Sequence, residues 1–179
     1  MEKLNYKKFT VALVILVAFI GVIYFINIQV QKSFYPRHYS EYVEKYAKEF
    51  SVPEYVVYSV IKVESDFDKD AKSEKGACGL MQLMPETYEW LVSARGETVK
   101  DIFEEEENIK YGTYYLSVLY DRYENWTYAL CAYNAGMGNV DKWILEEEFY
   151  IHFPETKYYV NKLEVVQDKY KSLYYRKGV

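Results

Sequence analysis

The segment VVYSVIKVE, residues 56–64, is an apolar run that ends in a carboxylate, Glu64. It follows SVPE, residues 51–54, in which Ser51 and Glu54 have the spacing of a helix capping box and Pro53 suits a first turn. We therefore predict a buried helix that carries Glu64 at its C-terminal end. Apolar surroundings disfavour a charged carboxylate, so we expect the pKa of Glu64 to be raised.

Taken alone, a glutamate at the end of an apolar helix is more often an ordinary carboxylate than a catalytic one. Two further motifs accompany Glu64: GACGLMQ at residues 76–82 and AYNAG at residues 132–136. Their small residues permit tight turns and close backbone approach. Gln82 offers donor and acceptor atoms suited to the N-acetyl and hydroxyl groups of a sugar. The combination indicates a site that cleaves a glycosidic bond, with Glu64 as the proton donor.

Over roughly residues 40–170, the order, spacing and type of these motifs resemble the lytic transglycosylase catalytic domain of the soluble-transglycosylase type. The segments 64–87, 132–136 and 155–160 carry the resemblance. It implies a mainly α, lysozyme-like globular domain with a sugar-binding cleft. It also implies that Glu64 acts first as acid and then as base toward the C6 hydroxyl of the substrate. The MurNAc-GlcNAc β-1,4 bond of peptidoglycan is then cleaved without water, leaving a 1,6-anhydroMurNAc end.

The resemblance also places a group of side chains in the cleft as substrate contacts. These residues are Ser65, Ser73, Gln82, Met84, Tyr133, Asn134, Glu155 and Tyr159. Structural roles stay open for several of them: loop capping for the serines, core packing for Met84, and a salt bridge for Glu155. Three positions depart from the family pattern, namely Asp68-Lys69, Cys78 and Lys157. They bear on loop rigidity, rate and specificity more than on the class of reaction.

Two other functions remain open. A hydrolytic muramidase of the goose-lysozyme type would need a further carboxylate to hold water. The loop after Glu64 offers four acids for this role: Asp66, Asp68, Asp70 and Glu74. A non-catalytic scaffold that binds peptidoglycan is the alternative from another class, and the retained proton donor argues against it.

No metal or organic cofactor is implied by the sequence. His38 and His152 are isolated, and Cys78 and Cys131 lack the spacing of a metal site. Both cysteines flank predicted active-site motifs, so a disulfide between them and a pair of buried thiols are both open.

Residues 9–31 contain no charged side chain over 23 positions. As a helix, this run is long enough to cross a hydrocarbon core about 30 Å thick. A cleaved signal peptide is the alternative, but the run is longer than usual and lacks a small-x-small cleavage site. We predict a single transmembrane anchor at 9–31, a short tether at 32–38 and a catalytic domain at 39–179. The lysines of residues 1–8 favour a cytoplasmic N-terminus, which places the catalytic domain outside the cell membrane.

The formal net charge is −5, and lysines outnumber glutamate by three to one in residues 1–8, so the rest of the chain is more acidic still. Nucleic-acid binding is therefore disfavoured. The expected partners are peptidoglycan strands, the membrane and, more generally, a cell-envelope protein complex. The acidic run at 104–107 is predicted to be the solvated first turn of a helix. Further helices are predicted at 39–50, 54–64, 85–94, 101–123, 126–135, 139–147 and 156–174, with no repeat and no long strand pattern.

Overall fold

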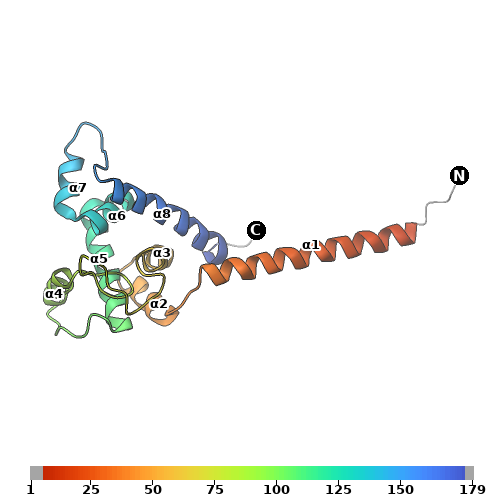
Figure 1. Ribbon diagram of the computed structural model, residues 1–179, viewed down its shortest axis with the longest axis horizontal. Helices are drawn as coiled ribbons and strands as arrows, with labels where there is room; N and C mark the ends of the chain where they lie inside the picture. The colour runs from red at the N-terminus through yellow and green to blue at the C-terminus, as the bar shows by residue number, and fades with distance from the viewer. Residues whose placement is uncertain (1–5, 176–179) are drawn as a thin grey trace. The chain divides into compact units, whose positions relative to one another are not determined.

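The structure is a computed structural model that describes residues 6–175 of the 179-residue chain. The chain divides into two compact units, Met1–Pro36 and Arg37–Val179. In the first unit, helix α1 (Tyr6–Phe34) covers the predicted anchor and extends past it at both ends (Figure 1). Its segment Lys8–Phe34 is apolar and long enough to cross a membrane, and its most apolar window is not buried in protein. Lys3, part of the predicted basic N-terminus, lies outside the described residues.

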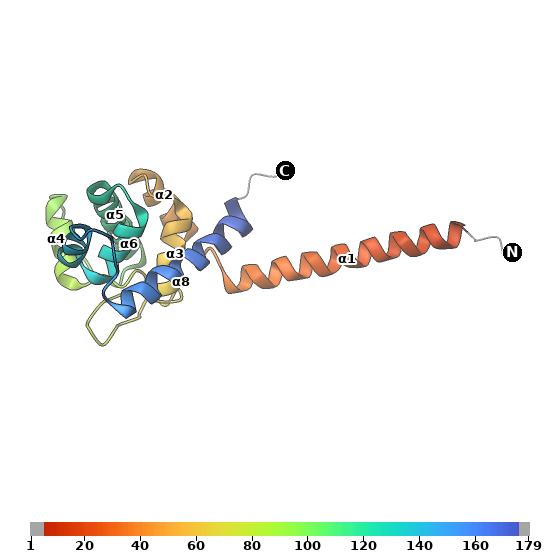
Figure 2. The same cartoon turned by 90° about the horizontal axis from the view of Figure 1, so that it is seen from above.

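The second unit is mainly α, as predicted, and within the described residues it holds no β-strand, only isolated bridges from Cys78 to Lys72 and Leu83. Figures 1 and 2 show its helices gathered around α3 and α5. The elements are α2 (Ser40–Glu49), α3 (Glu54–Glu64), α4 (Pro85–Ala94), α5 (Glu105–Tyr123), α6 (Trp126–Ala135), α7 (Met137–Ile144), α8 (Pro154–Tyr170) and the π-helical turn η1 (Lys171–Tyr175).

Helix α3 is buried because its apolar residues surround it rather than forming one stripe. Residues 56–61 are all buried, and α3 packs against both α8 and α2. Helix α5 packs against α2, α4 and α6. Its predicted apolar face is confirmed: Ile109, Leu116 and Leu119 are fully buried, and Tyr115 is nearly so. These two helices form the frame on which the loop between α3 and α4 rests.

The predicted capping box at Ser51 is wrong. Ser51 is exposed with φ 56°, and α3 begins after Pro53 without any side-chain cap. Ser51 is turned away because its N–H continues the C-terminal turn of α2, donating to the carbonyl of Lys48. The helix start nevertheless lies where it was predicted, since Pro53 presets the backbone for the first turn.

The starts of three other helices differ from the prediction by two or more residues. Helix α5 starts at Glu105 and not Asp101, because Asp101 closes a turn with Oδ1 accepting from Phe103 N at 2.9 Å. Helix α7 starts at Met137, directly after Gly136 in an extended conformation with φ 84° that only glycine adopts easily. Helix α8 starts at Pro154, two residues earlier than predicted.

The acidic run at 104–107 is not simply solvated, so that prediction is wrong in part. Glu106 pairs with Lys45 at 2.7 Å, and Glu107 is 3% exposed and pairs with Lys100 at 2.6 Å. The run therefore ties the start of α5 to neighbouring segments. Within the described residues no group of His, Cys, Asp and Glu is arranged to hold a metal ion. Cys78 and Cys131 are both buried free thiols, not a disulfide.

Candidate active site

Glu64 is the last residue of α3, and the chain leaves the helix immediately after it. Asp66 and Phe67 both have positive φ, 52° and 68°, which ends the helix and turns the chain into the loop 65–84. Ser65 Oγ donates to the carbonyl of Ile61 at 3.2 Å and to that of Leu80 at 2.8 Å. Ser65, predicted to contact substrate, therefore fastens the helix end to the loop and does not line the cavity described next.

A cavity of about 370 Å³ opens in front of Glu64. It is lined by residues of the loop 65–84, of α6 and of α8. Six of the eight predicted substrate contacts line it: Ser73, Gln82, Met84, Tyr133, Asn134 and Glu155. Glu74, Lys75 and Ala77 also line it. Glu74 had been considered as an acid that could hold water and Ala77 belongs to the GACGLMQ motif, whereas Lys75 was not singled out from the sequence. The structure thus brings together residues from four separated segments of the chain.

Burial raises the pKa of Glu64 to about 7, partly offset by Tyr159 and by the positive charge of Lys162. Tyr159 interacts with the Glu64 carboxyl, although its buried hydroxyl meets no partner with full hydrogen-bond geometry among the described residues. The pKa values of Tyr133 and Tyr159 are raised well above normal by burial and then by the charge of Glu64. Both phenols therefore stay neutral beside a carboxyl group that is poised to carry a proton near neutral pH.

The loop 65–84 is held by its own side chains. Gln82, with φ 49°, donates from Nε2 to the carbonyl of Ala71 at 3.0 Å and to that of Gly79 at 2.9 Å. Ser73 Oγ accepts from Ala77 N at 2.9 Å. Gln82 and Ser73 thus order the loop as well as lining the cavity.

Asn108 on α5 is a residue that the sequence analysis missed. It is fully buried; its Oδ1 accepts from Met81 N at 2.7 Å, and its Nδ2 donates to the carbonyls of Cys78 and Ile102 at 3.0 and 2.8 Å. A Cβ on Gly79 would lie 2.3 Å from Asn108 Nδ2, so glycine is needed there. In the sequence, Asn108 directly follows the acidic run of a predicted helix. Helical periodicity does not indicate that a polar residue at this position is buried.

Two contacts attach the AYNAG motif of α6 to the rest of the site. Tyr133 donates from its hydroxyl to the carbonyl of Met81 at 2.7 Å. Asn134 Oδ1 accepts from Thr156 Oγ1 at 2.7 Å, which joins α6 to the one buried residue in the first turn of α8. A second cavity of about 210 Å³ shares Gln82, Met84, Tyr133 and Asn134 with the first and continues to Thr87. The two cavities therefore adjoin one another along these four shared residues.

Comparison with known proteins agrees with this geometry. Residues 41–152 match the family model described as Transglycosylase SLT domain. The soluble lytic murein transglycosylase of Escherichia coli K12 is 32% identical over 115 residues, which cover 62% of this chain and 18% of that protein. Membrane-bound lytic murein transglycosylase C of Actinobacillus pleuropneumoniae is 35% identical over 119 residues, covering 59% of this chain and 33% of that one.

The fold also matches a solved structure. The crystal structure of the 70 kDa soluble lytic transglycosylase from Escherichia coli superposes with a TM-score of 0.74 at 27% identity, covering 79% of this chain and 25% of that one. This chain thus spans about a fifth to a third of the length of these relatives. Because the family model covers well over half of the sequence, and includes Glu64 and every described residue that lines its cavity except Glu155, the chain belongs to the transglycosylase SLT domain family.

Proposed function

We propose that this protein is a membrane-anchored peptidoglycan lytic transglycosylase that cleaves the MurNAc-GlcNAc β-1,4 bond and leaves 1,6-anhydroMurNAc ends. The observation that carries the proposal is Glu64: a carboxyl group with a pKa raised to about 7 that lines a cavity together with polar side chains from three other segments of the chain. The relatives support it, since several are named as lytic murein transglycosylases, soluble or membrane-bound.

In the proposed reaction, protonated Glu64 donates its proton to the glycosidic oxygen as the bond to C1 of MurNAc breaks. The resulting carboxylate then accepts the proton of the MurNAc C6 hydroxyl as O6 bonds to C1. Glu64 ends the cycle protonated, and no water is consumed. Burial favours the protonated form of Glu64 before the first transfer, and the neutral phenol of Tyr159 favours the carboxylate that this transfer leaves. Gln82, Asn134 and Met84 are proposed to bind the sugars.

A hydrolytic muramidase is the second candidate, and it needs a further carboxylate near the cavity to hold a water molecule. Asp66 pairs with Lys62, and Asp68 Oδ1 accepts from the backbone N–H of Asp70. None of these three acids lines the cavity, whereas Glu74 does. Glu74 is therefore the one loop carboxylate placed to hold a water molecule next to the reacting sugar.

Mass spectrometry of the soluble products separates the two candidates. We expect the full-length protein in detergent to release anhydromuropeptides from purified peptidoglycan, and the Glu74→Gln variant to release the same products within about threefold of the rate. Removing a non-reacting carboxyl costs little, whereas loss of a general base typically costs about 10²–10⁴-fold. Reducing-end products that disappear in Glu74→Gln would identify a muramidase instead.

The pH dependence follows from the raised pKa of Glu64. Since the free enzyme must carry the proton that it donates, kcat/KM is expected to be level below about pH 6 and to fall as pH rises through about 7. Above that point the fall approaches about tenfold per pH unit, because only the protonated fraction reacts. Initial rates on solubilised glycan strands between pH 5 and pH 9 test this, and a rate that keeps rising through pH 8 would contradict it.

We propose that residues 9–31 anchor the protein in the membrane once, with residues 1–8 in the cytoplasm, 32–38 as a tether and 39–179 as the catalytic domain outside. The length and hydropathy of α1 and the existence of a relative named as membrane-bound support this arrangement. Protease added to intact spheroplasts is expected to digest the catalytic domain while a cytoplasmic control protein survives. Protection of the domain until the membrane is permeabilised would show the opposite orientation.

A further inference from the structure

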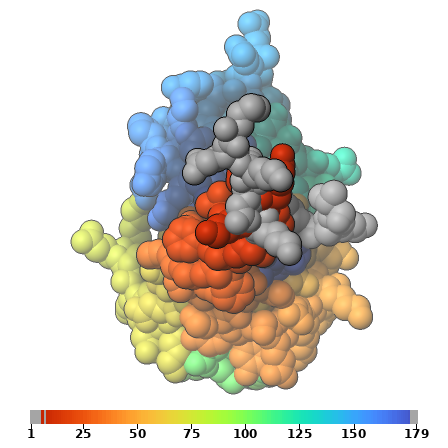
Figure 3. All heavy atoms as spheres, turned by 90° about the vertical axis from the view of Figure 1, so that its right-hand side faces the viewer, coloured from red at the N-terminus to blue at the C-terminus, as the bar shows by residue number. Residues whose placement is uncertain are grey.

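Lys75 and Glu155 form an ion pair between two walls of the cavity that contains Glu64. Lys75 Nζ lies 3.2 Å from Oε1 and 3.1 Å from Oε2 of Glu155, and both residues line the cavity. Lys75 belongs to the loop 65–84 and Glu155 to the first turn of α8. Figure 2 shows this loop, in olive, beside the start of α8, in blue, and Figure 3 shows yellow loop atoms and blue atoms at the same edge of the domain.

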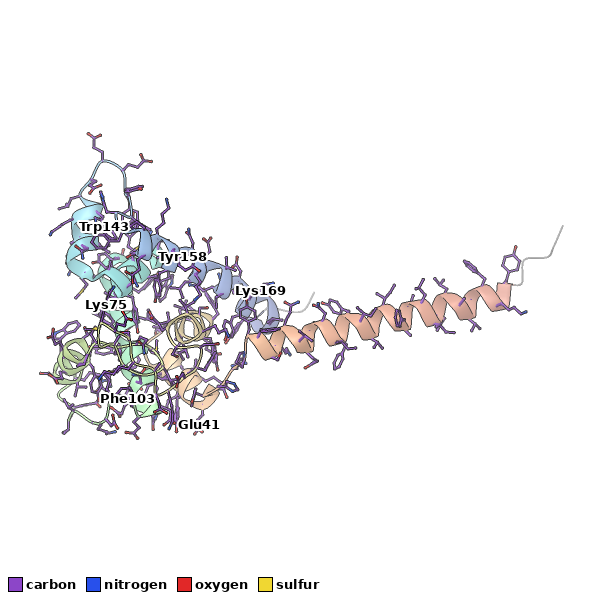
Figure 4. All side chains as sticks on the ribbon, in the orientation of Figure 1. Glu41, Lys75, Phe103, Trp143, Tyr158 and Lys169 are labelled. Atoms are coloured by element: carbon purple, nitrogen blue, oxygen red, sulfur yellow. The ribbon has the colours of Figure 1, made fainter. Side chains whose placement is uncertain are left out.

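The backbone beneath each partner is firmly held. On the loop side, Ser73 accepts at its carbonyl from Gly76 N at 2.9 Å and donates from its N–H to the carbonyl of Ala77 at 3.0 Å. Lys75, labelled in Figure 4, thus sits within a closed turn. On the other side, Thr156, next to Glu155, is buried and bonded to Asn134. The backbone positions of Lys75 and Glu155 are therefore both held by hydrogen bonds in the neighbouring residues.

The two side chains themselves are free to separate. Their exposed fractions are 77% for Lys75 and 70% for Glu155. An ion pair this exposed contributes little to stability, because water screens the attraction and holding two long side chains costs entropy. A ligand group can replace either partner at little cost.

The charges around the cavity are unequal. Among the described residues that line it, three bear carboxyl groups, Glu64, Glu74 and Glu155, and Lys75 is the only cation. The sugar rings of peptidoglycan glycan are neutral, but the lactyl group of MurNAc carries either a free carboxylate or a stem peptide with carboxylates of its own. Such an anion is repelled by the carboxylates of Glu74 and Glu155 and attracted by the ammonium group of Lys75.

Building on the proposed function, we propose that Lys75 binds a carboxylate of the muramyl substituent and that Glu155 holds Lys75 in place until substrate replaces it. Lys75 is then a specificity-determining residue that distinguishes muramyl glycan from neutral glycan. Its ligand is the lactyl acid itself or an acid of the stem peptide, and both offer the same chemistry to the ammonium group.

The test is equilibrium binding by calorimetry, with the full chain in detergent micelles and Glu64→Gln in every protein to prevent turnover. The ligand is a MurNAc-GlcNAc tetrasaccharide with free lactyl acids. Lys75→Glu is expected to raise its Kd by about tenfold, equivalent to about 1.4 kcal/mol. Lys72→Glu is the matched control: Lys72 is exposed on the same loop and does not line the cavity. It is expected to leave Kd unchanged.

Two further ligands identify the source of the carboxylate. One carries the lactyl group as a methylamide, and the other carries it as an amide to alanyl-glutamate with free acids. The protein that retains Lys75 is tested with both ligands, and each Kd is compared with that of the free lactyl acid. If both ligands bind more weakly, Lys75 binds the lactyl acid. If only the methylamide binds more weakly, Lys75 also accepts an acid of the stem peptide. Equal binding of all three ligands by the Lys75 protein overturns the proposal.

A charge-swapped protein, Lys75→Glu with Glu155→Lys, tests whether the ion pair serves only to join the loop 65–84 to α8. The swap can rebuild the ion pair between the loop and α8 but moves the cation to the opposite wall. We expect Kd for the free acid to stay raised, and recovery of the original Kd would show that the pair only joins the two segments. Because no turnover is measured, these results stand whether or not the products carry anhydro ends.

Discussion

Glu64→Gln is expected to lower the rate of anhydromuropeptide release by roughly 10²–10⁴-fold, the usual contribution of a general acid-base group. Glutamine has almost the same shape but cannot donate a proton to the glycosidic oxygen or accept one from the C6 hydroxyl. Glu64 performs both transfers in the proposed reaction, so no second residue replaces it. The measurement is the initial rate of product release by liquid chromatography and mass spectrometry, using full-length protein in detergent.

The same variant is expected to fold at least as well as the natural protein. The pKa of Glu64 is raised by folding from 4.5 to about 7, so ionisation opposes the folded state. The stability of the natural protein is therefore highest below about pH 4.5 with respect to this group and declines until pH passes about 7, whereas Glu64→Gln removes that decline. A melting temperature above that of the natural protein at pH 8 would confirm it.

Two controls test whether the loss of activity is specific to the Glu64 carboxyl group and to the chemical step. Glu89→Gln makes the same chemical change at an exposed position on α4, away from the cavity, and is expected to keep full activity. Peptidoglycan binding by Glu64→Gln, measured by pull-down, is expected to persist. If Glu64→Gln releases product at more than about a tenth of the natural rate, Glu64 is not the general acid.

Asn108→Ala is expected to lower the free energy of unfolding by about 3 kcal/mol, because each buried polar group left without a partner costs roughly 1–3 kcal/mol. The substitution leaves the buried Met81 N–H and the partly buried carbonyl of Ile102 without this partner, and it removes one of the two bonds to the carbonyl of Cys78, which still accepts from Leu83 N. Urea denaturation followed by far-UV circular dichroism measures the change. Activity is expected to fall as well, since the carbonyls that hold Ser65 and Tyr133 belong to the same loop.

Asn125→Ala is the matched control for this result. Asn125 caps α6 by accepting from Thr127 N and Tyr128 N, but it is exposed, so water can take over those bonds. Loss of such a cap costs about 1 kcal/mol. Equal destabilisation by the two alanines would mean that Asn108 contributes only local hydrogen bonds and not the attachment of the loop.

Much of the helical architecture was predictable from residue order. Helix α6 was predicted with its observed bounds, and the buried face of α5 was predicted from Ile109 and its partners. Helical periodicity is a local property, so neighbouring residues contain enough information to predict it. Ser51 shows where a prediction from local spacing fails. Its side chain had the spacing of a helix cap, but its backbone N–H donates to the carbonyl of Lys48 in the preceding helix.

Part of the candidate site was also predictable from the sequence, and part was not. Glu64 and six of its cavity-lining companions were identified from motifs, because each lies in a short segment whose residue types are unusual for packing alone. Ser65 and Tyr159 were named as substrate contacts but do not line the cavity, since sequence spacing does not say which way a side chain faces. Asn108, Thr156 and Lys75 act through partners 22 to 80 residues away in the chain.

For this chain, the local pattern was sufficient to predict the apolar helix α1, most of the other helices and the carboxyl group proposed as the acid, because hydrophobicity, helix propensity and residue chemistry act over a few positions. The raised pKa of Glu64, the attachment of the loop to α5 and the unequal charge around the cavity required the folded domain. Each depends on burial and on contacts between segments far apart in sequence, and desolvation and ion pairing exist only once those segments have been brought together.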